Sequence, residues 1–266
     1  MDGYFTDDSM LRRVNREWAL ALSGPRALLM QAAHPLAVTG LLAHTDSIDD
    51  PYGRLERTAE IMNVIGFGSK AEADRVTGIV RTQHARVRGR LPAAVGAYPK
   101  GTPYAADDPE LLLWVLATLA DSALVVYRRY VGSLSAAERD AYWQDYRRVG
   151  RLFGLRLRDM PRDIDGFDAY MEDMLASGDL HVSDRARELG KQIVLHPPLP
   201  LTARPLVELV NFITVGLLPP DLRRQYRLSW DPLRGLALAG GAEYVKRVLV
   251  PLLPGRVRWV PSARAT

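Results

Sequence analysis

The stretch DPELLLWVLATLADSALVVYRRYV, residues 108–131, predicts a long helix that decides the class of the fold. Asp108 is a favourable N-cap residue, and Pro109 suits the first turn because its missing N–H is not needed there. Asp121 falls at helical spacing on the apolar face that also holds Trp114, so its carboxylate is expected to point inward. The stretch therefore predicts a helical fold with a charged group in its interior.

Signals for helix starts and ends recur along the whole chain. Ser69 with Glu72 and Ser135 with Glu138 each form a capping-box pattern. No segment shows convincing period-two alternation, and residues 91–106 form the longest predicted loop. The prediction is an all-α fold, a single domain over residues 1–266 with about ten helices. The helical segments are expected at about residues 8–22, 25–34, 35–44, 51–66, 70–88, 109–131, 135–154, 165–176, 183–195, 205–217, 220–226 and 231–253.

Composition excludes several kinds of site. The chain of 266 residues has no cysteine, so disulfides, thiolate metal sites and a cysteine nucleophile are absent. Its net charge of +4 is spread over many helices without a nucleic-acid motif, and we expect no nucleic-acid partner. Residues 1–8 contain no apolar run, so a signal peptide is not expected. Residues 27–44 approach membrane-span length, but interrupting polar residues favour a buried helix, and we expect a cytoplasmic protein that binds no membrane.

The predicted helix 51–66 carries an arginine on its apolar face. Arg54, Thr58 and Ile61 share this face at helical spacing. A buried guanidinium needs an anionic partner, because an unpaired buried charge is costly. Asp121 is one candidate partner, and an anionic ligand is another. Thr58 either bonds the carbonyl four residues before it or faces a site.

A histidine lies on the apolar stripe of the next predicted helix. His84 shares this stripe with Val80 and Val87, and no H-E-x-x-H motif accompanies it. A lone inward histidine is either a hydrogen-bonded core residue or, in an apolar wall, a proximal haem ligand. Asp121 is also a candidate to orient the far nitrogen of this imidazole. His34, before a proline, either satisfies a carbonyl freed by that proline or is the second-choice iron ligand.

Other catalytic signatures are absent from the chain. We find no P-loop, no G-x-S-x-G nucleophile motif and no G-x-G-x-x-G that follows a predicted strand. Kinase, hydrolase and nicotinamide-dependent reductase functions are therefore not indicated.

Five segments together resemble one known family. They are GPRALLMQAAHP (24–35), DPYGRLERT (50–58), VRTQHARVRG (80–89), DPELLLWV (108–115) and GLLPP (216–220). The set resembles the DUF2236 family, also called the MpaB-like or rubber oxygenase (latex-clearing protein) catalytic domain. The resemblance extends over nearly the whole chain.

The resemblance implies globin-like core helices around a pocket for haem b (heme b). By motif, the histidine that ligates iron in the latex-clearing branch corresponds to His84. The Arg-x-x-x-Thr pair near the haem corresponds to Arg54 and Thr58. The catalytic glutamate that precedes the arginine in that branch has no clear equivalent here, which makes rubber itself a doubtful substrate.

These observations lead to one functional hypothesis and one alternative. The hypothesis is a haem b-dependent oxidoreductase, an oxygenase or dehydrogenase, with His84 as the single axial ligand. Its expected partners are a small apolar organic substrate, dioxygen and an electron-transfer partner. Arg54, His34 and Asp121 are candidate cofactor-binding residues, and Arg54 and Thr58 are candidate catalytic residues. The alternative is a non-catalytic helical protein in which Arg54 clamps an anionic small molecule.

Overall fold

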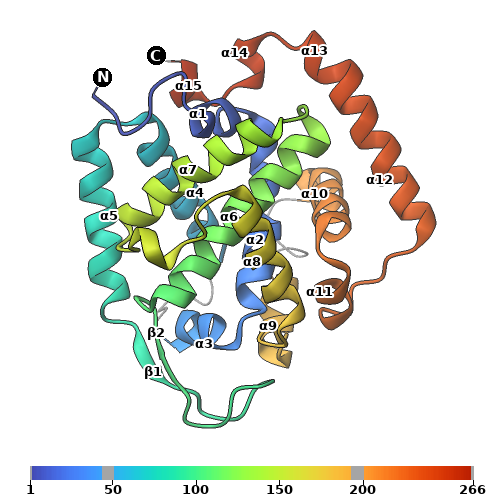
Figure 1. The fold of residues 1–266 in the computed structure, drawn as a ribbon. Helices are drawn as coiled ribbons and strands as arrows, with labels where there is room; N and C mark the ends of the chain where they lie inside the picture. Colours follow the sequence, from blue (N-terminus) through green and yellow to red (C-terminus); the bar gives the residue numbers. More distant parts are fainter. Residues whose placement is uncertain (1, 44–50, 193–200, 265–266) are drawn as a thin grey trace.

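Helices account for 71% of the computed structural model, which describes residues 2–43, 51–192 and 201–264. The predicted all-α fold is therefore confirmed (Figure 1). The longer α-helices are α2 (Ser23–Ala32), α3 (Pro35–Ala43), α4 (Pro51–Phe67), α5 (Lys70–His84), α6 (Pro109–Tyr130), α7 (Ala136–Leu152), α8 (Ile164–Ala176), α10 (Arg204–Leu217) and α12 (Pro232–Tyr244). The shorter ones are α1 (Met10–Asn15), α9 (Asp184–Gly190), α11 (Pro220–Gln225), α13 (Val250–Leu252), α14 (Gly255–Arg258) and α15 (Pro261–Arg264).

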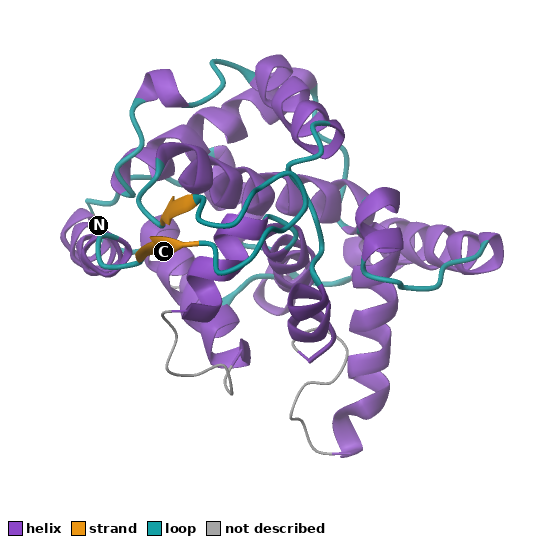
Figure 2. Ribbon diagram, turned by 90° about the horizontal axis from the view of Figure 1, so that it is seen from below, coloured by secondary structure: helices purple, strands orange, loops and turns teal. Residues whose placement is uncertain are grey.

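The remaining regular elements are short. Two strands, β1 (Arg88–Arg90) and β2 (Pro103–Ala105), form an antiparallel pair, and Figure 2 shows how small a part of the molecule they make. Single turns of 3₁₀-helix are η1 (Trp18–Leu22), η2 (Leu157–Asp159) and η4 (Leu201–Ala203), and a π-helical turn, η5 (Val245–Leu249), joins α12 to α13. The structure has more helices than the roughly ten expected because several of its α-helices, such as α13, α14 and α15, are only three or four residues long.

Helix α6 runs through the middle of the molecule, with α2 packed along it (Figure 1). Its predicted start is confirmed, since the Asp108 side chain accepts hydrogen bonds from the N–H groups of Glu110 and Leu111. Among the described residues, α6 is also the one helix with the length and hydropathy needed to cross a membrane. However, 67% of its most apolar window is buried inside the protein, as in the central helix of a helical core.

The main core gathers large side chains from α6, α7 and α8. Trp114, Tyr142, Trp143 and Phe167 are almost completely buried in it. The Trp143 and Phe167 rings lie 4.4 Å apart between centroids, a distance typical of aromatic pairs. The predicted capping box of Ser135 and Glu138 starts α7 and so sets which of its faces carries these aromatic residues. A smaller cluster connects the end of α6 to α10 and α12.

The two-stranded hairpin is a correction to the sequence analysis, which predicted no strand. Helix α5 ends at His84 instead of continuing to Arg88, and Gly89 then pairs with Tyr104 across the strands. A Cβ atom on Gly89 would collide with the Tyr104 ring, so this pairing requires glycine. Strands of three residues are too short to show a period-two pattern, and their pairing partner lies outside any local window.

Candidate functional site

A cavity opens between α2, α4, α5 and α6, with α7 and the segment after it at one end. The cavity has a volume of about 140 Å³. This is smaller than the roughly 300–1,000 Å³ typical of pockets that enclose drug-sized molecules. Its polar lining side chains are Gln31, Thr58 and His84, and most of the others are leucine, isoleucine, valine, methionine or phenylalanine.

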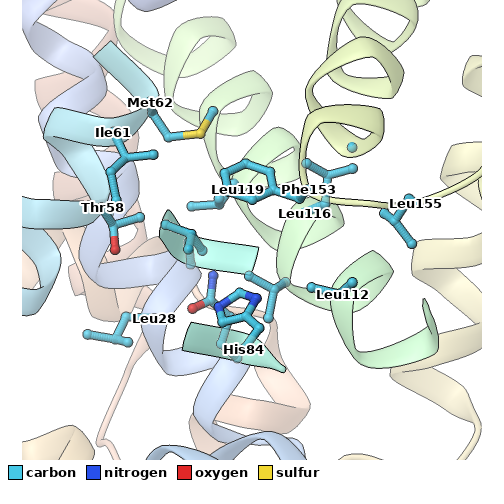
Figure 3. A pocket seen from close by; sticks show the side chains of 16 residues that line it. Leu28, Thr58, Ile61, Met62, His84, Leu112, Leu116, Leu119, Phe153 and Leu155 are labelled. Carbon is cyan, nitrogen blue, oxygen red and sulfur yellow. The ribbon is translucent and has the colours of Figure 1, made fainter. Parts of the chain in front are cut away.

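His84 enters the cavity from the last position of α5. The capping box of Ser69 and Glu72 starts this helix, so the register of α5 is set fifteen residues before the histidine. The His84 side chain is half-buried, and its Nδ1 atom is inaccessible to solvent. Figure 3 shows the ring near Leu28 on one side and Leu112 on the other. The imidazole therefore lies in an apolar wall.

Helix α4 forms the opposite wall. Thr58, Ile61 and Met62 line the cavity along this helix, as Figure 3 shows. Thr58 is half-buried and lines the cavity, and whether its hydroxyl bonds the carbonyl four residues before it or faces a bound molecule stays open. Arg54 belongs to α4 one turn before Thr58, but its side chain lies outside the described part of the structure. The predicted proximity of Arg54 and His84 stays a prediction.

Gln31 is a lining residue that the sequence analysis missed. Its side-chain Nε2 donates to the Thr118 hydroxyl at 3.0 Å, and Thr118 in turn donates to the Val115 carbonyl at 2.8 Å. This chain of hydrogen bonds holds the Gln31 amide against α6, where it presents a polar group to the cavity. The sequence signal was weak, because a glutamine on an otherwise apolar helix is common at partly exposed positions.

Asp121 does point inward, but it pairs with an arginine that the sequence analysis did not consider. Arg26 Nη1 lies 2.7 Å from Asp121 Oδ2 and also 2.7 Å from Ser122 Oγ, and Arg26 Nε donates to the Leu217 carbonyl at 2.8 Å. The Arg26 side chain is only 5% exposed. These extra hydrogen bonds compensate the desolvation of the buried charge.

This ion pair changes the expected role of Asp121. The carboxylate is not among the described residues that line the cavity, and it lies instead beside a separate cleft between α6, α7 and α8. Its observed partner is Arg26, whereas the proposed pairing with Arg54, whose side chain lies outside the described part of the structure, stays a prediction. A usable signal for Arg26 existed, because it shares a helical face with the buried Leu29 and Met30.

His34 lies outside the cavity lining and caps a helix. Its Nδ1 accepts a hydrogen bond from the N–H of Leu36 at 3.3 Å, and its Nε2 lies 3.4 Å from the Tyr98 hydroxyl. The expectation that His34 satisfies a freed carbonyl was wrong. The first turn of α3 leaves backbone N–H groups without a partner inside the helix, so the His34 ring accepts a hydrogen bond from one of them. Burial lowers the pKa of His34 to about 4. Both ring nitrogens of His34 lie against protein groups, the Leu36 N–H and the Tyr98 hydroxyl, and neither faces the cavity.

The donor set of the cavity fits one type of metal group better than others. Within the described ranges no cluster of three or more histidine, cysteine or acidic residues is placed to hold a metal ion. One imidazole in an apolar enclosure matches a metal that brings its own equatorial ligands, as haem iron does. The chemistry of this donor set, a single imidazole, is therefore the kind that suits haem iron.

The fold and the cavity define an all-helical domain with one histidine in an apolar enclosure. The chain belongs to the family described as ER-bound oxygenase mpaB/B'/Rubber oxygenase, catalytic domain, whose model matches residues 12–247. This confirms the resemblance seen in the sequence and assigns the chain to a family of oxygenase catalytic domains.

Two relatives from mycobacteria cover most of the chain. Uncharacterized protein Mb2261 of Mycobacterium bovis and Uncharacterized protein Rv2237 of Mycobacterium tuberculosis are each 29% identical to it over 209 residues. The matched region is 77% of this chain and 78% of each relative. No solved structure matches the chain.

Proposed function

We propose that this protein is a haem b-dependent oxygenase that acts on a small apolar organic substrate. The observation that carries the proposal is the cavity that brings His84 and Thr58 together inside a wall of apolar side chains. The family supports oxygenase chemistry, and the single imidazole supports an axial ligand to haem iron. Dioxygen, an electron-transfer partner and a cytoplasmic location complete the proposal.

Each part of the cavity has a role in this proposal. His84 would hold the iron through one imidazole nitrogen, and the surrounding leucines would exclude water from the bound group. Arg54, one helical turn before Thr58, would find its anionic partner in a haem propionate. When bound, haem supplies the redox chemistry with dioxygen that the side chains cannot supply.

The protein side chains orient the substrate and exclude water. The Thr58 hydroxyl, on α4, donates a hydrogen bond to the molecule bound in the cavity. Ile61, Met62 and Phe153 contact the apolar substrate. Exclusion of water from this wall strengthens each hydrogen bond, because the local dielectric constant falls.

The test is an ultraviolet–visible spectrum of protein supplied with haem during expression or reconstituted afterwards. We expect a Soret band with one haem per chain, and we expect His84→Ala to lose it. The matched control is His181→Ala, which removes an exposed histidine outside the cavity and should keep the band. Added imidazole should restore haem binding to His84→Ala. Absence of a Soret band in the haem-supplied wild type, or an unchanged band in His84→Ala, contradicts the proposal.

The alternative function, a non-catalytic carrier in which Arg54 clamps an anionic ligand, predicts a different pattern. A carrier gives no Soret band, and its ligand affinity is lost in Arg54→Gln but nearly unchanged in His84→Ala. Thermal-shift measurements with apolar carboxylates on both variants therefore separate the two functions.

A further inference from the structure

The C-terminal helices carry a row of exposed apolar side chains that the proposed function does not use. On α12 and the turns after it, Leu233 is 77% exposed, Leu236 69%, Tyr244 57% and Leu252 75%. Isolated exposed apolar residues are normal, but several large ones on the same segment favour an interaction surface. We call these four residues the apolar ridge.

The ridge follows one side of α12, η5 and α13, while the opposite side packs on the protein. Leu238, Ala242 and Val250 are the buried residues of this segment. The apolar side of a helix is normally buried, whereas this segment leaves apolar side chains uncovered. The π-turn η5 has more residues per turn than an α-helix and so reduces the rotation between Tyr244 and Leu252, and both are exposed although Val250 between them is buried.

The positive charge of the chain is concentrated in the same segment. Residues 232–264 contain six lysine and arginine residues and one glutamate, a net charge of +5. The whole chain has a net charge of only +4, so the other residues together carry −1. Three of these six cations are paired with carboxylates: Arg247 with Glu243 at 3.2 Å, Arg234 with Asp231 at 3.3 Å and Arg258 with Glu17 at 2.6 Å. In the described part of the chain, Lys246 and Arg256 have no carboxylate within ion-pair distance, so their charges are available to a partner.

The position of the ridge allows contact with an extended surface. Figure 1 shows α12 and α13 along one edge of the molecule, on the side away from α5. The neighbouring α10 packs against α12 and adds exposed Leu206 and Leu209. Leucine and tyrosine next to lysine and arginine form the combination that binds the interface of a bilayer with anionic lipids.

We propose that the apolar ridge docks on an anionic lipid bilayer, with its leucines among the acyl chains and its cations at the lipid head groups. This departs from our expectation of no membrane contact, which considered only spanning segments and signal peptides. A second copy of this chain suits the ridge less well, because a symmetric contact places the cations Lys246 and Arg256 of both copies at the same interface. The docking is independent of the haem proposal, since the ridge and the cavity lie on different sides.

The test is flotation of the full chain with phosphatidylcholine vesicles that contain or lack phosphatidylserine. We expect binding to the anionic vesicles at low salt and its loss at high salt. Leu233→Gln and Leu252→Gln should each weaken the partition about tenfold. Lys246→Gln and Arg256→Gln should each weaken it about fivefold.

Two controls keep the test specific. Leu157→Gln changes a leucine that is 49% exposed but lies outside the ridge, and Arg75→Gln removes an exposed arginine on α5; both should bind as the wild type does. Circular dichroism verifies that every variant is folded. A wild type that ignores anionic vesicles, or ridge variants that bind equally well, overturns the proposal. So does a wild-type dimer in sedimentation velocity that Leu233→Gln converts to monomer without any vesicle binding.

Discussion

Acid should destabilise this protein through one buried histidine. His34 is 5% exposed, and its Nδ1 accepts the Leu36 N–H, so the neutral imidazole is the form that fits the structure. Burial lowers its pKa to about 4 from an ordinary value of 6.5. The folded state therefore binds fewer protons than the unfolded state between these values. This contribution to stability is complete above pH 6.5 and is lost as the pH falls towards 4.

The size of the effect follows from the difference between the two pKa values. Each pH unit over which only the unfolded state is protonated is worth about 1.4 kcal/mol. The loss relative to pH 8 is about 2 kcal/mol at pH 5 and about 3 kcal/mol at pH 4. Such a loss is a large part of the stability of an ordinary domain.

The assay is urea unfolding followed by circular dichroism at several pH values, for the wild type and His34→Asn. Asparagine keeps an acceptor for the Leu36 N–H but does not titrate. All other titrating groups are common to both proteins, so their difference in unfolding free energy isolates His34. We expect the variant to gain about 2 kcal/mol relative to the wild type between pH 8 and pH 5. A difference that stays constant over this range would show that His34 is not held neutral by burial.

Three further predictions concern the core, the hairpin and the cavity. Arg26→Met removes one partner of a buried ion pair and should lower the unfolding free energy by about 3 kcal/mol in urea titrations; a loss below about 1 kcal/mol contradicts the pairing. Gly89→Ala forces a collision with Tyr104 and should cost about 1–3 kcal/mol, whereas Gly132→Ala, with open space at its Cβ position, should not; equal melting temperatures for the two variants refute this. Thr58→Val keeps the side-chain volume and should retain haem but slow reductant-dependent dioxygen consumption about tenfold in an oxygen electrode; an unchanged rate removes Thr58 from the reaction.

Local sequence was sufficient for most helix starts. The capping boxes at Ser69 and Ser135 and the N-cap Asp108 all have the predicted hydrogen bonds. Each of these signals involves groups within three residues of one another, so no knowledge of the rest of the chain is needed. The family was also recognisable, because its motifs are runs of neighbouring residues.

Several features of the site were decided only by distant contacts. The inward direction of Asp121 was predictable from helical spacing, but its partner was not, because Arg26 is 95 residues away in the sequence. The same holds for His34, whose far nitrogen meets Tyr98 from the loop between β1 and β2. The role of Arg54 and the single-domain organisation stay predictions.

The sequence by itself determined that the chain is helical, where most helices begin, and to which oxygenase family it belongs. Hydrogen bonds within one turn and the periodicity of apolar residues carry that information. Only the tertiary structure decided which inward polar groups meet, that His84 and Thr58 line one cavity, and that an apolar helix such as α12 leaves one side uncovered. The physical reason is that a residue's position in its own helix sets the direction of its side chain, whereas the packing of the other helices sets which groups that side chain contacts.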